Sequence, residues 1–378
     1  MKIVIATHVY SPGPSQEMRK YLIQNKIDEL LWISHPLFYD NKLKGSGFEK
    51  YIHGKLQIEK YSKIKEESQI KSYILHFYKT IKFVLKNKEK YDLFIGYDNL
   101  NALAGIFLKK MKKVKKTIYY VVDYSPIRFE NKILNKIYHW IESYCAKNCD
   151  ETWNLSQRMI DARLKFKGIK IDSKQKVVPM GIWYNEIKRY KFNEINQHQI
   201  VFVGHILEKQ GIQYVLNAIP QIIKQIPDIQ LIIIGDGPYL QNLKDIVSKL
   251  KINKNIEFLG FVKDQNKVNK ILAKSALALA LYSKEDPLRN YTYYSDPGKI
   301  KTYLGAGVPI LITNVPHNAK EIQDKGCGEI VNENKEIISK KIIQIIKNKN
   351  ILSQYRKNTE KYAKNFDWNR IFQGAFEK

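Results

Sequence analysis

The chain has 378 residues, of which 44% are hydrophobic and 27% are charged, so its composition excludes a disordered or collagen-like protein and allows two or three globular domains. Its three cysteines are too few for a secreted disulfide framework, and its first apolar run is too short for a signal sequence, so we expect a cytoplasmic protein without a membrane span. The formal net charge of +27 indicates a polyanionic partner or an anionic membrane surface, unless it only reflects a compositional bias toward Lys, Ile, Asn and Tyr.

Apolar runs alternate with amphipathic stretches along the first half, which is the pattern of a parallel sheet covered by helices. Strands are expected at residues 2–7, 30–34, 92–97 and 117–122, and the segments 151–156 and 177–181 complete this half. Helices are expected at residues 15–24, about 55–90, 99–113 and 132–149. The polar segment 184–198 then suits an interdomain linker.

The same alternation restarts after this segment. Strands are expected at residues 199–204, 229–235, 256–260, 276–282 and 308–313, and helices at residues 209–226, 238–250, 264–274 and 297–307. Such a series forms a right-handed doubly wound sheet whose ligands bind at the carboxyl ends of the strands. The predicted fold class is therefore α/β, with Rossmann-like domains at residues 1–190 and 191–363 that face a central cleft.

Three strand-to-helix turns of the second half contain glycine, which permits positive φ and a close backbone approach. The first turn has Gly204, His205 and Lys209, the second has Gly235, Gly237 and Pro238, and the third has Gly260, Phe261 and Val262. The first turn can meet a diphosphate beside free helix amides, and the main chain of the third can read the edge of a base. On the alternative interpretation, the glycines only form turns and Lys209 is a solvated residue.

The segment 281–313 combines a polar loop with a helix start. The loop contains Glu285, Asp286 and Asp296, and the helix begins near Gly298 with Lys299 in its first turn. Such a helix start can hold an anion while the carboxylates face sugar hydroxyls. Charged loop residues are usually only solvated, but the coincidence of glycine, lysine and helix start favours a functional site.

Two strand-end turns of the first half supply candidates for the acceptor side. His8 and Gly13 follow the first strand, and Asp123, Tyr124 and Arg128 follow a later one. On the alternative interpretation, a lone His or Asp at a strand end is a hydrogen-bonded structural residue.

The stretches 72–88 and 107–116 are basic and also contain aromatic or apolar residues. The second stretch contains six lysines, which are Lys109, Lys110, Lys112, Lys113, Lys115 and Lys116. Both stretches form either ordinary solvated helix surfaces or a membrane-facing patch.

The motifs GHILEKQG, IIIGDGP, FLGFV and DPGKIKTYLGAGVPI, in this order and spacing, resemble those of glycosyltransferase family 4, the retaining group with the GT-B fold. The resemblance is specific from residue 199 to about 330, and residues 364–378 are similar to the family's terminal helix, which crosses back to the N-terminal domain. Family members often have an arginine and a lysine at the positions of His205 and Gln210. They also often have two glutamates for the donor sugar and ribose, at the positions of Tyr294 and Thr302.

The resemblance implies transfer of a sugar from a nucleotide diphosphate donor to an acceptor, with retention of configuration and with the leaving phosphate helping to deprotonate the acceptor. Glu285, Asp286 and Asp296 are the possible substitutes for the missing glutamates. We expect no cofactor and no metal, because the sequence has no Asp-x-Asp triplet. Lys209, Lys299 and helix amides would then stabilise the leaving phosphates, and Asp123 is the catalytic candidate on the acceptor side.

The expected partners are a nucleotide-sugar donor, a saccharide or lipid-linked acceptor such as a polyprenyl phosphate, and an anionic membrane at its cytoplasmic face. A nucleotide-sugar epimerase of the same architecture is one alternative. A polyanion-binding protein is another, but the strand-end motifs argue against it, and no nucleic acid is expected because the sequence has no recognisable nucleic-acid module.

Overall fold

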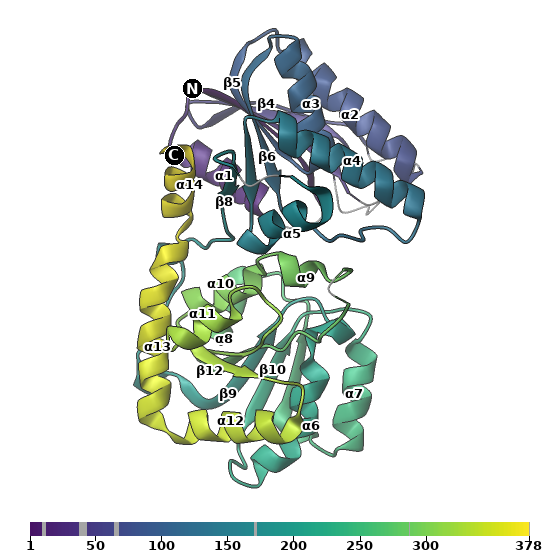
Figure 1. Ribbon diagram of the computed structural model, residues 1–378. Helices are drawn as coiled ribbons and strands as arrows, with labels where there is room; N and C mark the ends of the chain where they lie inside the picture. The colour runs from purple at the N-terminus through teal and green to yellow at the C-terminus, as the bar shows by residue number, and fades with distance from the viewer. Residues whose placement is uncertain (10–12, 38–43, 64–67, 170–171, 287, 378) are drawn as a thin grey trace. The chain divides into compact units, whose positions relative to one another are not determined.

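The structure, a computed structural model, describes residues 1–9, 13–37, 44–63, 68–169, 172–286 and 288–377 (Figure 1). The chain divides into two compact units. The first consists of Met1–Pro179 and Phe372–Lys378, and the second of Met180–Ile371. None of the described helices is both long and apolar enough to cross a lipid bilayer.

The first unit is built on a mostly parallel sheet with the strand order β4-β3-β2-β1-β5-β6-β7-β8. Its strands are β1 (Lys2–Val9), β2 (Glu29–Pro36), β3 (Gly47–Ile52), β4 (Lys55–Tyr61), β5 (Tyr91–Tyr97), β6 (Val114–Val121), β7 (Glu151–Asn154) and β8 (Gln175–Val177). The central strands are continuous apolar runs because helices cover both of their faces. Among the described strands of this sheet, only the pairs β2–β3 and β3–β4 are antiparallel.

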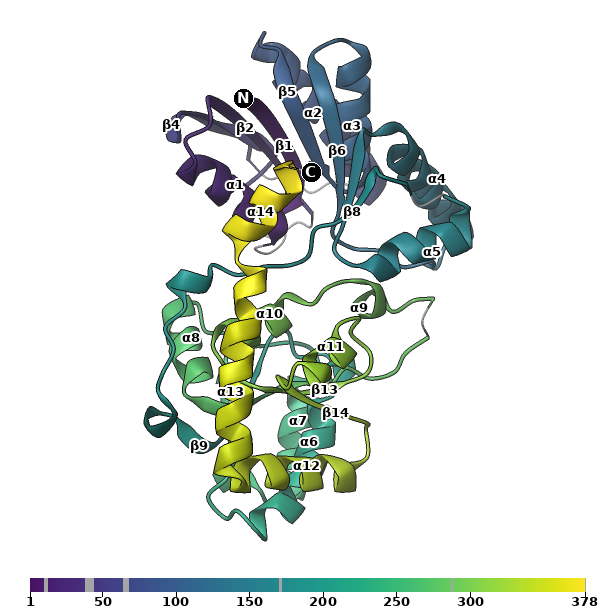
Figure 2. The same ribbon diagram turned by 60° about the vertical axis from the view of Figure 1, so that its left-hand side comes forward.

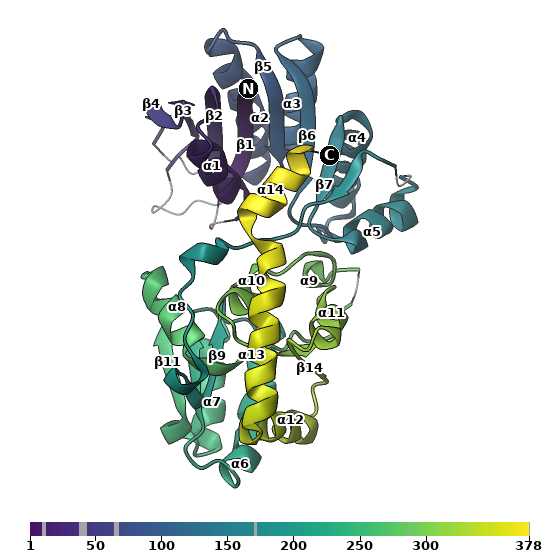
Figure 3. The same ribbon diagram turned by 90° about the vertical axis from the view of Figure 1, so that its left-hand side faces the viewer.

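Helices cover both faces of this sheet. They are α1 (Pro14–Gln24), α2 (Gln69–Lys86), α3 (Asn99–Lys110), α4 (Lys132–Asn148), α5 (Gln157–Lys167) and the end of α14 (Trp368–Glu377). Figure 3 shows α1 and α14 in front of the sheet and α2 and α3 behind it. The rings of Tyr21 in α1 and Phe372 in α14 lie 5.3 Å apart, so the last residues of the chain pack within the first unit.

The second unit has a fully parallel sheet with the order β11-β10-β9-β12-β13-β14. Its strands are β9 (Asn196–Val203), β10 (Gln230–Ile234), β11 (Ile256–Gly260), β12 (Ser275–Ala280), β13 (Ile310–Thr313) and β14 (Gly328–Val331). This is the 3-2-1-4-5-6 order of a dinucleotide-binding fold, in which the order reverses between β9 and β12. A parallel Rossmann-like sheet in each unit confirms the predicted α/β fold class.

The helices of the second unit enclose one apolar core on each side of the sheet. They are α6 (Ile212–Ile223), α7 (Leu240–Lys249), α8 (Gln265–Ala273), α9 (Tyr291–Tyr294), α10 (Gly298–Gly305), α11 (Ala319–Asp324), α12 (Lys335–Lys347) and α13 (Lys349–Ala363). Helix α13 runs beside α10, as Figure 2 shows.

The two ends of the second unit are paired with each other. The amide of Ile182 donates to the carbonyl of Phe366 over 2.8 Å, and the amide of Trp368 donates to the carbonyl of Ile182 over 2.9 Å. The segment 184–198, expected to be a linker, packs partly on this unit, because Tyr184, Ile187 and Tyr190 contact its core.

One element prediction is wrong. Residues 55–90 were expected to be one long helix, but residues 47–61 form the hairpin of β3 and β4, and a helix begins only at Gln69. The turn uses His53 and Gly54, which have φ values of +46° and +76°. Two consecutive residues with positive φ are the signature of a tight hairpin turn, and a glycine-containing pair favours it.

Candidate functional site

The carboxyl ends of β9, β10 and β11 are joined by glycines. The amide of Gly204 donates to the carbonyl of Ile234 over 3.0 Å, and the amide of Gly235 donates to the carbonyl of Gly260 over 2.8 Å. Gly204 and Gly235 have φ values of +144° and +142°, and a Cβ atom on Gly235 would overlap the carbonyl of Gly204. The three turns therefore lie backbone to backbone, and the strand ends present main chain rather than side chains.

Lys299 lies against this glycine edge. A Cβ atom on Gly204 would lie 3.1 Å from its Nζ, and the ammonium also lies 4.2 Å from the ring centre of Phe202. Nζ donates to the side-chain oxygen of Gln210. Because β9 and β12 flank the point where the strand order reverses, and α10 follows β12, Lys299 lies where this type of sheet binds its ligands.

Lys299 has no carboxylate partner among the residues that the structure describes. Burial without a compensating negative charge lowers the pKa of Lys299 to about 7. An anion bound beside the ammonium would restore its charged form. A partly buried lysine at the ligand end of a Rossmann-like sheet is thus a candidate for a phosphate ligand.

Lys209 lies in the turn before α6, where its ammonium is 3.9 Å from Glu285 and 4.1 Å from the ring centre of Tyr291. The carbonyl of Lys209 accepts a 3.0 Å bond from the amide of Ser283, which ties this turn to the end of β12. The structure thus brings Lys209 and Glu285 together, and it is the neighbouring Gln210 that contacts Lys299.

The turn after β9, with His205, and the turn after β10, with Gly237 and Pro238, meet at Ile206. His205 is exposed and its Nδ1 lies 2.8 Å from the carbonyl of Asp236, which also accepts from the amide of Ile206 over 2.9 Å. Gly237 is required because a Cβ atom there would overlap the carbonyl of Ile206. Pro238 follows this contact, just before α7.

The remaining predicted donor residues occupy different environments. Phe261 is exposed, whereas Val262 packs on the apolar core. Gly298 begins α10, and the hydroxyl of Thr302 donates to its carbonyl over 3.2 Å. Tyr294 is buried.

Asp296 does not fit the predicted role of a sugar ligand. Its carboxylate is fully buried, lies 3.1 Å from both Lys301 and His317, and accepts a 2.9 Å bond from the amide of Met180. We therefore revise it to a structural residue of the second unit. The carboxylate of Asp286 accepts a 2.9 Å hydrogen bond from the amide of Leu288 in the same loop. Glu285 and Asp286 are both exposed, so they are the predicted carboxylates that face solvent.

The first unit contains a cavity of about 740 Å³ at the carboxyl ends of β1, β5 and β6. Apolar side chains from α2, α3 and α4 form most of its wall, including Ile74, Phe77, Leu103, Leu134 and Ile141. Polar residues at the strand ends close one side of it.

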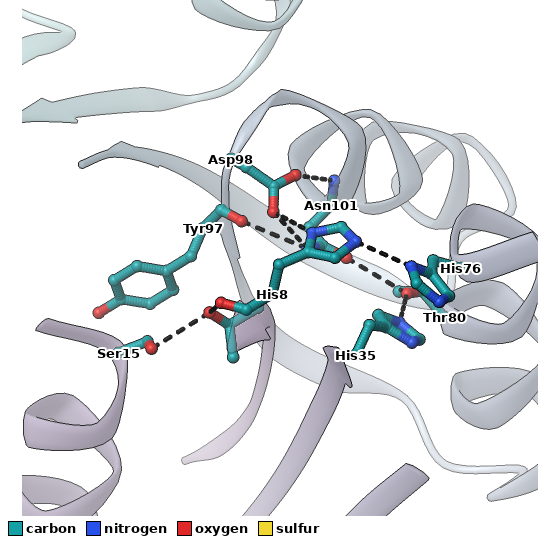
Figure 4. Close-up of polar contacts among 9 residues, drawn as sticks. His8, Ser15, His35, His76, Thr80, Tyr97, Asp98 and Asn101 are labelled. Atoms are coloured by element: carbon teal, nitrogen blue, oxygen red, sulfur yellow. Dashed lines mark hydrogen bonds and ion pairs between the residues drawn. The ribbon is translucent and has the colours of Figure 1, made fainter. Parts of the chain in front are cut away.

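The polar side of this cavity is a hydrogen-bonded network centred on His8 (Figure 4). Nδ1 of His8 lies 2.6 Å from Oδ2 of Asp98, and Nε2 lies 3.1 Å from Nδ1 of His76. Asn101 donates to the same Asp98 oxygen over 2.8 Å and, through its amide, to the other oxygen over 2.9 Å. When Nδ1–H of His8 donates to Asp98, its Nε2 is free to accept from His76.

The parallel register of the sheet builds this network. His8 in β1 pairs with His35 in β2, and Asp98 follows β5, the other neighbour of β1. Burial, followed by the repulsion of His8, lowers the pKa of His76 to about 3 and lowers that of His35 well below its usual value. Both rings are therefore neutral at physiological pH and hold His8, while Asp98 lines the cavity as the exposed end of the network.

The structure brings together four of the five acceptor-side candidates. His8, Gly13, Asp123 and Arg128 all line the cavity, and the guanidinium of Arg128 donates to the carboxylate of Asp123. Tyr124 is different, because it is fully buried and does not belong to the cavity lining.

Sequence reasoning missed Asp98, His76 and Gln210. Asp98 carried a usable signal, since it directly follows a predicted strand, as Asp123 does, and it also caps the start of the next helix. Gln210 was noted only as a departure from the family pattern. No pattern in the sequence connects His76, in the middle of α2, to the strand ends.

Three of the six lysines in the basic stretch 107–116 form ion pairs. Lys109 pairs with Asp150 over 2.5 Å, Lys115 with Asp92 over 2.7 Å, and Lys116 with Glu151. Lys110 donates to the hydroxyl of Tyr144 over 3.3 Å. The ion pairs therefore weaken the argument that this stretch alone forms a positive patch.

Comparisons with known proteins agree with this architecture. Residues 197–348 match the family described as Glycosyl transferases group 1. The chain is similar to the alpha-monoglucosyldiacylglycerol synthase of Acholeplasma laidlawii, with 25% identity over 62% of this chain and 58% of that protein. It is also similar to the UDP-Gal:alpha-D-GlcNAc-diphosphoundecaprenol alpha-1,3-galactosyltransferase of Escherichia coli, with 22% identity over 67% of this chain and 65% of that protein.

The chain therefore spans less than two thirds of the length of either relative. Among solved structures, HepE of Anabaena in complex with UDP superimposes with a TM-score of 0.70 over 100% of this chain and 99% of that one, at 13% identity. The chain thus has the GT-B fold, and its second unit contains a glycosyltransferase group 1 domain.

Proposed function

We propose that the chain is a glycosyltransferase whose second unit binds a nucleotide diphosphate sugar and whose first unit binds the acceptor. The observation that carries the proposal is Lys299, a partly buried lysine without a described carboxylate partner at the ligand end of the Rossmann-like sheet. Two relatives are named for sugar transfer to lipid or lipid-linked acceptors, and the similar solved structure is a complex with UDP. These names support a UDP-type donor and a lipid-linked or glycan acceptor.

In the proposed reaction, the acceptor oxygen forms a bond to the anomeric carbon of the donor sugar. The bond from that carbon to the diphosphate breaks with its electron pair, and the acceptor proton passes to the leaving phosphate. Lys299 and the amides in the first turn of α10 would stabilise the charge that develops on the diphosphate. Retention of configuration belongs to this proposal, as the resemblance to family 4 implies.

Replacing Lys299 tests the diphosphate assignment. Lys299→Ala should weaken UDP binding by about 1.5–3 kcal/mol, the range for hydrogen bonds to charged groups. Lys270→Ala is the matched control, because Lys270 is an exposed lysine of the same unit. Calorimetric titration with UDP measures both, and equal affinity in the two variants would refute the role of Lys299.

We also propose that transfer needs no metal ion, because a lysine and backbone amides already supply positive charge to the diphosphate. Turnover of the correct UDP-sugar should then be unchanged in excess chelator. Activity that disappears with chelator and returns with magnesium would contradict this part of the proposal.

A further inference from the structure

We infer that the acceptor is an uncharged amphiphile, with a hydroxyl headgroup on a long hydrocarbon tail. This tail would occupy the cavity of the first unit. This inference rests on the proposed function and narrows its acceptor, which sequence reasoning left open between a lipid-linked sugar and a polyprenyl phosphate. It follows from the wall of the cavity, its charges and its opening.

The wall suits a hydrocarbon chain. Three helices contribute apolar side chains to a space of about 740 Å³, and among them Phe77, Leu103 and Ile141 are only partly exposed. A sugar or nucleotide would leave most of its polar groups without partners against such a wall. A hydrocarbon tail has no polar groups and therefore needs no hydrogen-bond partners.

The charges at the polar side exclude a phosphate headgroup. Arg128 is the only Lys or Arg among the described residues that line the cavity, and it already pairs with Asp123. His8 is likewise held by Asp98. The two carboxylates leave no excess positive charge for a phosphate or diphosphate, but they can accept hydrogen bonds from hydroxyl groups.

Asp98 is the better placed of the two carboxylates. His8 and two donors from Asn101 fix its orientation, and its side chain is about one third exposed. We therefore assign Asp98 to the acceptor hydroxyl and His8 to the positioning of Asp98.

The cavity opens onto apolar stripes of two helices. Ile70 and Ile74 of α2 and Ile137 of α4 line it and are also 58%, 67% and 50% exposed. Each stripe continues on the surface, with Tyr78 on α2 and Trp140 on α4. Exposed lysines lie on the same helices, including Lys71, Lys82, Lys132 and Lys136.

This combination of exposed apolar stripes and nearby lysines suits binding to the surface of an anionic bilayer. A lipid chain could pass from the bilayer into the cavity without crossing water, since the same isoleucines belong to both surfaces. The occupant that fits is therefore a membrane lipid with an uncharged head.

The test uses the full chain and soluble probes. Affinity for alkyl glucosides of eight, ten and twelve carbons should rise about fourfold per methylene, the value for burial of a CH₂ group. Farnesyl diphosphate should bind at least tenfold more weakly than dodecyl glucoside. No dependence on chain length, or a preference for farnesyl diphosphate, would overturn the inference.

Two variants separate the cavity from the rest of the protein. Leu103→Trp should lower the affinity for dodecyl glucoside at least tenfold by filling the cavity, whereas Phe107→Trp, one turn further along α3 and outside the lining, should not. Asp123→Asn should raise the affinity for farnesyl diphosphate by freeing Arg128. The assigned site is wrong if Leu103→Trp and Phe107→Trp bind dodecyl glucoside equally well, or if Asp123→Asn and the unchanged protein bind farnesyl diphosphate equally well.

UDP binding distinguishes this inference from the proposed function. All three variants should bind UDP as the unchanged protein does, because none alters the second unit. If the unchanged protein binds UDP but not the glucosides, the acceptor inference fails alone. If it binds no nucleotide diphosphate, the proposed function fails.

Discussion

At the scale of the residue, the position of Lys299 in the fold lowers its pKa, and this pKa can be measured by titration. Its pKa of about 7 means that the ammonium is partly deprotonated at neutral pH when no anion is present. A diphosphate binds the charged form, so binding should raise the pKa of Lys299 and take up protons.

The expected pH dependence follows from this shift. UDP affinity should be constant below the pKa of the free lysine and should fall as the pH rises above about 7, by up to tenfold per pH unit, until the pKa of the complex is reached. UDP also titrates in this pH range, and its titration affects both proteins equally. Subtracting the affinity profile of Lys299→Ala from that of the unchanged protein therefore leaves the contribution of Lys299. Parallel profiles between pH 6 and 9 would show that Lys299 does not bind the phosphates.

Residue types at strand ends were predictable from the sequence, but their partners were not. Lys299 was identified because it lies in the first turn of a predicted helix, next to Gly298, and His8 was identified because it follows an apolar strand. Asp296 looked equivalent, yet it is buried with Lys301 and His317, because a charge pattern in one dimension does not show which side chains turn inward. Tyr124 was misplaced for the same reason.

At the scale of the element, the glycine edge depends on close contact between turns. Gly235→Ala should destabilise the protein by more than about 2 kcal/mol and abolish UDP binding, because the new methyl group would overlap the carbonyl of Gly204. Gly260→Ala is the matched control, since Gly260 also has positive φ, +63°, but no described atom lies within 4 Å of a Cβ atom there.

The control should cost only the strain of a left-handed alanine, about 1–2 kcal/mol. Urea denaturation and UDP titration measure both effects. Equal losses in the two variants would mean that backbone conformation, rather than the contact with Gly204, decides the stability of this edge.

Most elements were predictable because apolar runs in parallel strands and amphipathic helices have distinct periods. The hairpin of β3 and β4 was missed although Leu56 and Ile58 of its outer strand alternate with polar residues. The alternation is short and marks no buried face, since Lys55–Lys60 are all exposed, and a lysine-rich segment resembles the surface of a helix.

At the scale of the whole molecule, the net charge of +27 is the excess of 64 Lys and Arg residues over 37 Asp and Glu residues, so every ion pair is already counted in it. The opening of the cavity adds exposed apolar side chains on α2 and α4, so we expect membrane binding to depend on these side chains as well as on charge. The full chain should sediment with anionic vesicles at low salt and not with neutral ones.

Two sets of substitutions separate these contributions. Replacing Lys109, Lys110, Lys112 and Lys113 with Gln should reduce binding at low salt and have little effect at high salt, because it removes four positive charges, of which only that of Lys109 is paired with a described carboxylate. Replacing Ile74 and Trp140 with Ser should reduce it strongly at every salt concentration, since both side chains are about two thirds exposed. Failure of the unchanged protein to bind anionic vesicles would make the net charge a compositional bias.

The paired ends of the second unit have a consequence for how such a chain can be altered. The chain leaves the first unit after Pro179 and rejoins it at Phe372, so the second unit is a continuous insertion within the first. Its two junctions are already tied together by the hydrogen bonds of Ile182 with Phe366 and Trp368. If the second unit binds the nucleotide sugar as proposed, a related unit grafted between Pro179 and Phe372 should change the donor while leaving the cavity of the first unit unchanged.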